Sequence, residues 1–529
     1  MTFCKPKLKI KPIEVPIWIV MLSVITFIST NNFFNNDNFF PIDYLYLLEY
    51  DGYLKSIQSF LPFEISPSTL RSILYFVITP LSSTYAPLSY IFYPTILIID
   101  DLSISFLFLN IVTIFINSII IYTIYNRIKD NDIRLFRICM IGVLSSIGGM
   151  IYLGTFTPYA YIQLSTILVL VMAIGDFSNP KKDIIILSIL YLLNYQIIYV
   201  IPIYFGLLIF YFLRKKKLPS KGVVFSFILL MIFIVSSLFF FAIRAKKVGI
   251  HESMGLGWNT GLRNEFIFEL NKDLYSEFIE LVTFLPRSIS YHIQPDLFNI
   301  EVITFLFWII LMILIISQVV DRFKSKIFLV GLLALLCYLV IVFIGKTSFG
   351  PTRHTLFLSP IFLFLFYPLV SRKFTLLVIP ILLYFNLHEI SNRKIEIPKI
   401  LGELVDIVKD YPNSDIMLIN CSYQPLMDKK FRNLLMDRNI FFYCGSRFQR
   451  VLKTKKSTSI LLIDSTNKNE GELERSINNR LGDEIYSSSD FSLIKTLINI
   501  KYDMEPRDFT QPKTESGLQL WIAPNKLKY

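Results

Sequence analysis

The chain has 529 residues, of which 53% are hydrophobic and only 17% are charged, and its mean hydropathy is +0.55. This composition excludes an ordinary soluble protein and is typical of a polytopic α-helical membrane protein. The formal net charge is +12, but the lysines and arginines form short clusters between apolar segments, which argues against the continuous basic stripe of a nucleic-acid-binding protein.

The first apolar segment covers about residues 15–30 and follows a tail that carries Lys5, Lys7, Lys9 and Lys11. No cleavage site of the small-x-small type follows it, and many further apolar segments come after it. We therefore interpret it as the first membrane helix rather than as a signal peptide.

An acidic stretch follows directly, NNFFNNDNFFPIDYLYLLEYDGYL at 31–54. Its acids are Asp37, Asp43, Glu49 and Asp51, and they stand among aromatic and aliphatic residues, which predicts a position at the membrane surface. Carboxylates there are candidates for chemistry, and the alternative is a solvated connector. Asp43 follows Pro41-Ile42 and precedes a helical pattern, so it also suits a helix N-cap.

Apolar runs of membrane-crossing length recur along the chain and, with the first, predict about eleven spans. The later runs lie near 102–126, 135–153, 158–175, 183–199, 200–213, 222–243, 301–320, 327–345, 355–370 and 374–388.

The basic residues orient these spans. With the N-terminus in the cytoplasm, every inner loop is basic, as the positive-inside rule requires. These loops carry Arg127, Lys129, Arg134 and Arg137, then Lys181 and Lys182, then Arg214 to Lys217, then Arg322, Lys324 and Lys326, and finally Arg372 and Lys373. The expected location is the plasma membrane, crossed many times.

Two large pieces within the expected membrane domain, residues 1–389, then lie outside. The first, 31–101, has apolar segments interrupted by Pro80 and Pro87, which favour interfacial helices over a helical hairpin. The second, 244–300, has a glycine-rich stretch before an amphipathic run and suits either a mobile lid or an inert loop. Its histidines, His251 and His292, show no metal-ligand spacing.

Residues 390–529 differ in composition and form the third outer piece. Short apolar runs at 415–421, 439–445 and 458–464 alternate with helical patterns at 424–438 and 470–482, and late strands are expected within 492–500 and 517–525. Strands that alternate with helices predict a small extracytoplasmic α/β domain with a mainly parallel sheet and no chemistry of its own.

Two cysteines each end a predicted strand of this domain, Cys421 and Cys444. Neighbouring parallel strands can bring them within bonding reach, so in an oxidising compartment they form either a disulfide or two free thiols.

Several segments resemble the GT-C glycosyltransferases, in particular the bacterial branch related to dolichyl-phosphate-mannose protein mannosyltransferases and lipid A aminoarabinose transferases. IDYLYLLEYDGYL is similar to the family's Asp-Glu-x-x-Tyr segment, with Asp43 in the Asp place and Tyr44 where Glu is usual. YAPLSYIFYPTILIIDD resembles the Pro-Pro-Leu interfacial helix and acidic turn, with Ala86 in place of the first proline. GGMIYLGTFTPYAY is similar to the turn between the third and fourth spans, and FGPTRHTLFLSP resembles the late Pro-Arg-Tyr segment, with Arg353 in the Arg place and His354 where Tyr is common.

The resemblance implies an enzyme that moves a sugar from a polyprenyl-phosphate carrier to a glycan, lipid or protein acceptor outside the cell. Such chemistry needs a base for the acceptor hydroxyl and positive charge for the departing phosphate. Asp43 is the expected base, with Asp37 as runner-up. Arg353 is the expected phosphate contact, assisted by Lys346 and His354, although a single interfacial arginine can equally snorkel to lipid headgroups.

The cofactor stays open: the adjacent carboxylates Asp100 and Asp101 suit a helix cap or the support of a divalent cation. Three other classes remain as alternatives. A polysaccharide polymerase or O-antigen ligase would centre its basic residues in one late loop. A transporter or flippase would carry ionisable residues within spans and show repeats. A non-catalytic scaffold would fit the departure at Tyr44.

Overall fold

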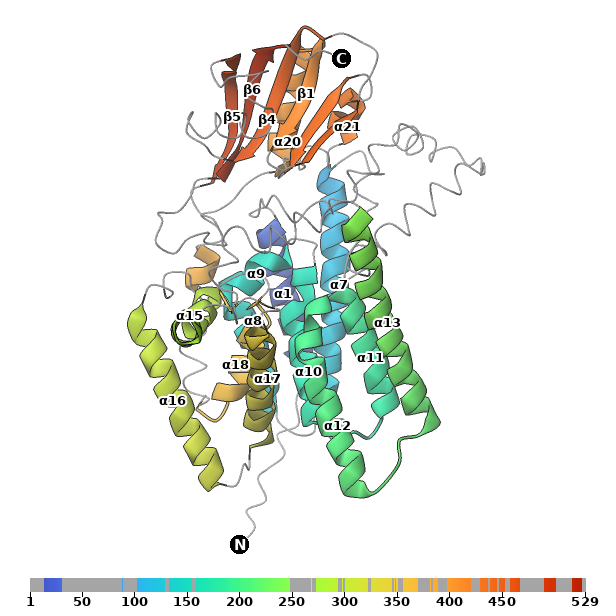
Figure 1. The fold of residues 1–529 in the computed structure, drawn as a ribbon, viewed down its shortest axis with the longest axis vertical. Helices are drawn as coiled ribbons and strands as arrows, with labels where there is room; N and C mark the ends of the chain where they lie inside the picture. Colours follow the sequence, from blue (N-terminus) through green and yellow to red (C-terminus); the bar gives the residue numbers. More distant parts are fainter. Residues whose placement is uncertain are drawn as a thin grey trace. The chain divides into compact units, whose positions relative to one another are not determined.

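A computed structural model gives the fold of the chain (Figure 1). It describes residues 14–30, 88, 102–128, 133–154, 158–247, 268, 273–293, 297, 300–321, 325–344, 347, 349–350, 355–369, 381, 384–388, 397–419, 429–435, 438–444, 447–451, 457–466, 490–500 and 516–525. These residues divide into two compact units, one of which carries most of the helices and the other the strands.

The first unit is helical, and of the helices named next it lacks only the start of α7 (102–109) and the end of α13 (240–247). Its α-helices are α1 (Glu14–Thr30), α7 (Leu102–Ile128), α8 (Ile133–Ser145), α9 (Ile147–Leu153), α10 (Ile162–Ile174), α11 (Pro180–Leu193), α12 (Ile201–Lys215), α13 (Lys221–Lys247), α15 (Leu274–Ile293), α16 (Glu301–Val320), α17 (Lys326–Phe343) and α18 (Leu358–Phe366). Two short 3-10 helices, η1 (Pro158–Tyr161) and η2 (Tyr195–Tyr199), lead into α10 and α12.

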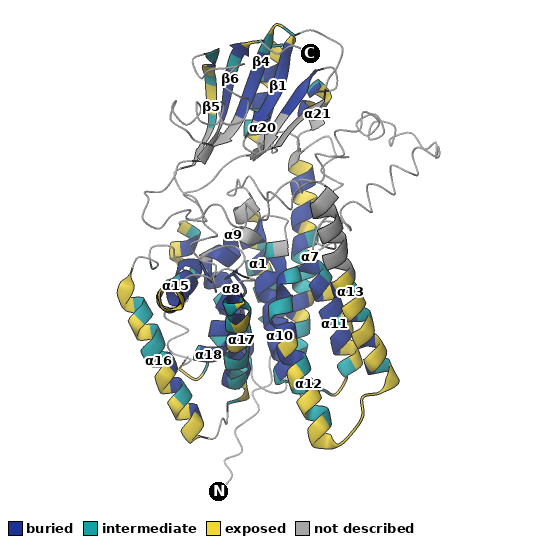
Figure 2. Cartoon of the chain, viewed as in Figure 1, coloured by how far each residue is buried: buried dark blue, intermediate teal, exposed yellow. Residues whose placement is uncertain are grey.

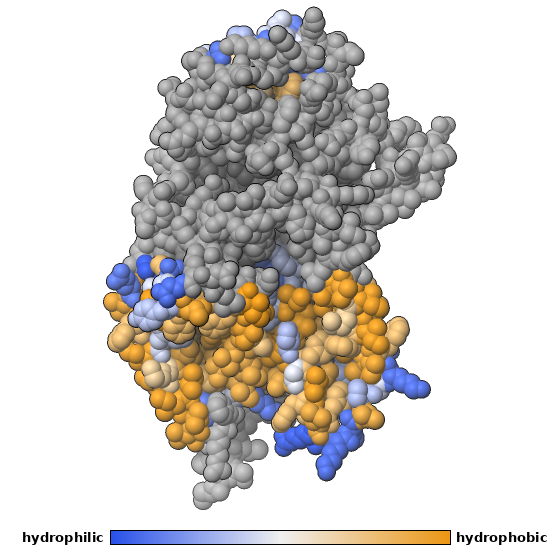
Figure 3. Space-filling view, in the orientation of Figure 1, coloured by the Kyte–Doolittle hydropathy of each residue, from blue (hydrophilic) through white to orange (hydrophobic). Residues whose placement is uncertain are grey.

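Three helical segments are long and apolar enough to cross a membrane within the described residues, namely Ser103–Ile128, Glu301–Val320 and Lys326–Phe343. The segments Glu14–Ile28, Tyr159–Ile174 and Lys221–Val235 are apolar but shorter. Large apolar side chains point outward along α12, α13 and α16, and they form an orange band across the face drawn in Figure 3 (see also Figure 2). Exposure of so many apolar side chains to water is unfavourable, so the helical unit associates with a membrane.

Two of the expected spans are interrupted. The run at 135–153 forms α8 and α9, which are separated at Ser146, and the run at 183–199 forms α11 and η2, which are separated at Asn194. Both interrupting residues are buried, and each has a side-chain oxygen that accepts a hydrogen bond from a following backbone N–H. The backbone groups released at each break are thereby partly satisfied, as the interior of a membrane protein requires.

Helix α15 contains Pro286, which cannot donate the usual hydrogen bond to the carbonyl of Val282. The indole Nε1 of Trp308 in α16 donates to that carbonyl at 2.7 Å, and Thr304 Oγ1 donates to the neighbouring carbonyl of Thr283 at 2.9 Å. Helices α15 and α16 are therefore joined by a hydrogen bond to the carbonyl whose usual backbone partner is replaced by Pro286. The expected amphipathic helix of the second outer piece is present as α15.

The second unit contains a six-stranded sheet in the order β3-β2-β1-β4-β6-β5. The strands are β1 (Ser414–Ile419), β2 (Ile440–Cys444), β3 (Arg447–Val451), β4 (Ser459–Thr466), β5 (Ser492–Ile500) and β6 (Ser516–Pro524), and the helices are α20 (Ile397–Asp410) and α21 (Lys429–Leu435). The expectation of a mainly parallel sheet is wrong. β1 pairs in parallel with β2 and β4, whereas β3, β5 and β6 add antiparallel pairs.

The amino end of β1 is held by side-chain hydrogen bonds. Asp415 is buried and accepts from Asn439 Nδ2 at 2.9 Å and from Asn525 Nδ2 at 3.0 Å. Arg438 donates to the carbonyls of Tyr411 and Val408, and burial lowers its pKa. The bonds of Asp415 join the start of β1 to the residue before β2 and to the residue after β6. The polar residues at this end of the strands therefore have a structural role.

Several sequence expectations fall on residues outside the described ranges. They are the domain boundary at 389/390, the interfacial segments of 31–101, the glycine-rich stretch before α15, the helical pattern at 470–482 and Cys421. Cys444 is the last residue of β2 and pairs in register with Arg447 of β3. The disulfide therefore stays a prediction.

Candidate functional site

All of the residues expected to carry chemistry lie outside the described ranges. They are Asp37, Asp43, Asp100, Asp101, Lys346, Arg353 and His354. The structure does describe residues on either side of the expected phosphate contact, at 347, 349–350 and 355–357, and these define how that segment is attached to the helices.

The residues that flank Arg353 in sequence are buried. Thr347 is 2% exposed, Phe349, Thr355 and Phe357 are each 0% exposed, and Thr347 is hydrogen-bonded to the side chain of Tyr199. The ring of Phe357 lies 5.0 Å from that of Tyr199. A loop that merely crossed the surface would leave these side chains in solvent. The segment is instead packed into the helical unit at both of its described ends.

His292, at the end of α15, bonds to this segment. Its Nε2 lies 2.9 Å from Thr355 Oγ1, and Thr355 donates its own hydroxyl hydrogen to the carbonyl of Gly350 at 2.8 Å. Because that hydrogen is used, Nε2 must carry the proton and act as the donor to Thr355. Burial lowers the pKa of His292 to about 3, so the imidazole is neutral near pH 7.

Ser146 connects the same histidine to two more helices. Its hydroxyl donates to the carbonyl of His292 at 2.9 Å and accepts from Gly149 N at 3.2 Å and from Gln163 Nε2 at 3.0 Å. It is thus the N-cap of α9 and the meeting point of α9, α10 and α15. We refer to Ser146, Gln163, His292 and Thr355 as the Ser146 cluster.

Two glycines permit the close approach within the Ser146 cluster. A Cβ at Gly149 would collide with the carboxamide of Gln163, and a Cβ at Gly148 would lie 2.9 Å from Leu356 and 3.0 Å from the Nδ1 atom of His292. A larger residue at either position would therefore displace Gln163, Leu356 or His292 from its place in the structure.

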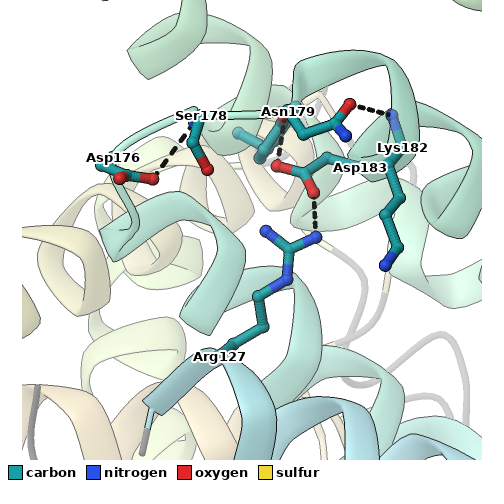
Figure 4. A network of polar contacts seen from close by, with 7 residues as sticks. Arg127, Asp176, Ser178, Asn179, Lys182 and Asp183 are labelled. Atoms are coloured by element: carbon teal, nitrogen blue, oxygen red, sulfur yellow. Dashed lines mark hydrogen bonds and ion pairs between the residues drawn. The ribbon is translucent and has the colours of Figure 1, made fainter. Parts of the chain in front are cut away.

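A second buried polar group lies where α7 ends and α11 begins (Figure 4). Asp183, 1% exposed, accepts from the guanidinium of Arg127 and from Tyr204 Oη at 3.0 Å. Asn179 caps α11 by accepting from Lys182 N at 3.2 Å. We refer to Arg127, Asp183 and Tyr204 as the Asp183 network.

The chemistry of each group follows from its bonding. His292 is neutral and its Nε2–H is committed to Thr355, so it suits a positioning role better than that of a base. Asp183 is compensated by Arg127 and also has a structural role. No group of three or more His, Cys, Asp or Glu residues that could hold a metal ion occurs among the residues the structure describes.

Sequence reasoning singled out neither Ser146, Gln163 nor Thr355, and it considered His292 only as a metal ligand. The signal available was the pair Gly148-Gly149 inside an otherwise apolar run, because adjacent glycines mark a close backbone approach. The residues that contact these glycines are distant in sequence, so the apolar run alone does not identify them.

Comparisons of the chain with protein-family models, with curated proteins and with solved structures found no match.

Proposed function

We propose that the chain is an integral membrane glycosyltransferase that moves a sugar from a polyprenyl-phosphate-linked donor to a glycan, lipid or protein acceptor on the outer face of the plasma membrane. In this proposal about eleven spans cross the membrane, the N-terminus is cytoplasmic, and the strand-containing unit is an extracytoplasmic α/β domain.

The observation that carries the proposal is the attachment of the segment around Arg353. Thr355 bonds to His292 on one side of Arg353, and Thr347 bonds to Tyr199 on the other. Recognition of a phosphate by a guanidinium requires that the arginine be held in one orientation. The burial and hydrogen bonds of the residues on both sides of Arg353 support this requirement.

The proposed reaction divides the work between two charges. The carboxylate of Asp43, or of Asp37, takes the proton from the acceptor hydroxyl as its oxygen bonds to the anomeric carbon. The bond between that carbon and the carrier phosphate breaks, and the negative charge on the departing phosphate is stabilised by Arg353, with Lys346 and His354 in the same loop. Asp100 and Asp101 either cap the next helix or support a divalent cation.

The test is sugar transfer by the purified full chain in lipid nanodiscs, with a polyprenyl-phosphate sugar as donor. Asp43→Asn and Arg353→Ala should each lower kcat/KM by at least about 100-fold, because each removes a charge used in the transition state. Asp176→Asn and Lys409→Ala change exposed charges elsewhere and serve as controls that should keep the wild-type rate. Wild-type turnover by both Asp43→Asn and Arg353→Ala would refute the assignment.

Thr355→Val and Thr355→Ser separate orientation of the segment from its mere presence. Valine keeps the size but removes both bonds of the hydroxyl, whereas serine keeps them. Thr355→Val should raise KM for the lipid-linked donor about tenfold, and Thr355→Ser should lie close to wild type. Equal KM values for the donor in the two variants would show that the hydrogen bonds of Thr355 do not contribute to donor binding.

A lipid-linked-sugar flippase is the second candidate, because of two observations. Interrupted helices with buried polar breaks occur at Ser146 and Asn194, and an ion pair with a buried acid, Asp183, lies at the start of α11. Transporters commonly place discontinuous helices and ionisable residues at their substrate path. Movement of a fluorescent polyprenyl-phosphate sugar across proteoliposomes, without transfer to an acceptor, would favour this candidate.

A further inference from the structure

Seven basic residues gather where α11 and α13 begin and α12 ends. All seven side chains are exposed: Lys181, Lys182, Arg214, Lys215, Lys216, Lys217 and Lys221. We refer to them as the basic patch. Among the residues that the structure describes, none of the seven has a carboxylate within ion-pair distance.

The basic patch has two parts that are distant in sequence but form one surface. Lys181 and Arg214 are 33 positions apart. A Cβ built at Gly222 would lie 3.4 Å from Cδ of Lys181, so the first turns of α11 and α13 touch. α12 ends at Lys215, and the backbone N–H groups of Lys216 and Lys217 donate back to the last turn of that helix. In Figure 3 hydrophilic side chains lie along the lower edge of the apolar band, in the region where Figure 1 shows the lower end of α12.

Two arginines elsewhere in the helical unit differ from the basic patch, because each is paired with a carboxylate. Arg127 is paired with Asp183, and Arg137 forms two hydrogen bonds with the carboxylate of Glu14. The exposed acid nearest in sequence to the patch is Asp176, whose carboxylate accepts from Ser178 N at 3.1 Å. The cations of the patch are exposed and therefore accessible to an anionic ligand.

The helix ends contribute partial charges of both signs. α11 and α13 present their N-terminal ends here, which carry partial positive charge, and α12 presents its C-terminal end, which carries partial negative charge. Lys216 has a φ of 50°, in the left-handed region where glycine is the residue of lowest cost at a helix end. A lysine at that position retains a charge at the expense of backbone strain.

Apolar side chains border the charges. Leu213 is 71% exposed, Leu218 93% and Phe225 67%, and they lie beside the cations in sequence. Apolar side chains next to lysines and arginines are the arrangement of a surface that meets lipid acyl chains and headgroups together.

We propose that the basic patch binds the phosphate headgroups of anionic phospholipids in the leaflet at this end of the helical unit. The lysines and arginines contact headgroup phosphates, and the exposed leucines and Phe225 contact the adjoining acyl chains. This inference does not depend on the glycosyltransferase proposal, because it uses neither the donor segment nor the Ser146 cluster.

The test measures lipid selectivity of the folded full chain in vesicles of phosphatidylcholine that contain spin-labelled phosphatidylglycerol. The wild-type chain should bind the anionic probe in preference to a spin-labelled phosphatidylcholine, and 1 M NaCl should weaken that preference. Lys215→Gln/Lys216→Gln/Lys217→Gln should lower the preference about tenfold or more, since each surface cation contributes severalfold to binding. Lys215→Arg/Lys216→Arg/Lys217→Arg should keep it.

Lys409→Gln/Lys495→Gln provides the matched control, because both lysines are exposed but each is paired with a carboxylate. It should leave the lipid preference unchanged. The proposal is overturned if the triple glutamine variant keeps the wild-type preference, or if the control loses as much. It is also overturned if an acidic peptide, added to vesicles of phosphatidylcholine alone, binds the patch more tightly than the anionic lipid does.

Discussion

The Ser146 cluster and the Asp183 network bury polar groups in the same helical unit by different means. The Ser146 cluster contains no charge at neutral pH and joins helices α9, α10 and α15 to the segment at Thr355 through a hydroxyl, a carboxamide and an imidazole. The Asp183 network joins α7, α11 and α12 through a carboxylate and a guanidinium. The Ser146 cluster therefore depends on close packing, and the Asp183 network depends on charge balance.

The difference sets how each network fails. Loss of one neutral hydrogen bond costs about 1 kcal/mol, plus more when a buried partner is left unsatisfied. Loss of one member of an ion pair leaves a charge in a buried position, which costs more than the pair itself contributed. Variants at the two sites should therefore differ in how much free energy of unfolding they lose and in how that loss depends on pH.

Arg127→Met should give the largest loss. It leaves Asp183, which is 1% exposed, with Tyr204 but without its cation, and we expect a loss of about 3 kcal/mol in the free energy of unfolding. The measurement is reversible unfolding in mixed detergent micelles. Arg127→Met/Asp183→Asn should recover more than half of the loss, because the buried charge is removed as well. A single variant as stable as wild type would contradict the compensation.

Ser146→Ala should follow. The substitution removes the acceptor for Gly149 N and Gln163 Nε2 and the donor for the carbonyl of His292, and we expect a loss of about 2 to 3 kcal/mol. The same unfolding titration provides the measurement. Ser178→Ala, at an exposed serine, is the control and should stay within about 0.5 kcal/mol of wild type.

The third prediction concerns pH: protonation of His292 should lower the stability of the folded chain in acid. Its pKa in the folded chain is about 3, below the usual 6.5, so between these values the unfolded chain binds a proton that the folded chain does not. Stability should therefore decrease as the pH falls below 6.5, by about 2 kcal/mol at pH 5. His292→Gln keeps an amide N–H in place of the imidazole N–H and should flatten that part of the stability curve. An equal pH dependence in wild type and variant would contradict the assignment.

Asn179→Ala should have the smallest effect. It removes the side-chain cap on Lys182 N at the start of α11, beside the Asp183 network but not part of it, and should cost about 1 kcal/mol. Asn179→Asp, which keeps an oxygen at the cap, should be nearly neutral. Thermal unfolding of the three proteins in one detergent gives the comparison. A loss as large as that of Arg127→Met would mean that the cap and the ion pair form one unit.

The bounds of several helices could be predicted from the sequence because hydropathy depends only on residue type. The run expected at 301–320 is α16 over the same residues, and those at 327–345 and 102–126 correspond to α17 and α7 within two residues at each end. The number of membrane crossings could not be fixed in this way, because several apolar helices are too short to cross alone.

The breaks and the sheet order could not be predicted, since they depend on distant partners. Ser146 interrupts an apolar run only because Gln163 and His292 converge on its hydroxyl. β3 was missed because its sequence, RFQRV at 447–451, is mostly polar, and its antiparallel pairing with β2 makes the sheet mixed. The roles of Asp43 and Arg353 stay predictions, because they rest on local pattern and family resemblance.

The proline in α15 also has a consequence for synthesis. The carbonyl of Val282 has no N–H from Pro286 to accept, and its partner, the indole of Trp308, is added by the ribosome 22 residues after the proline. Until α16 emerges, the nascent α15 must leave that carbonyl to water or to lipid headgroups. The final packing of α15 at Pro286 is thus expected only after Trp308 has been synthesised.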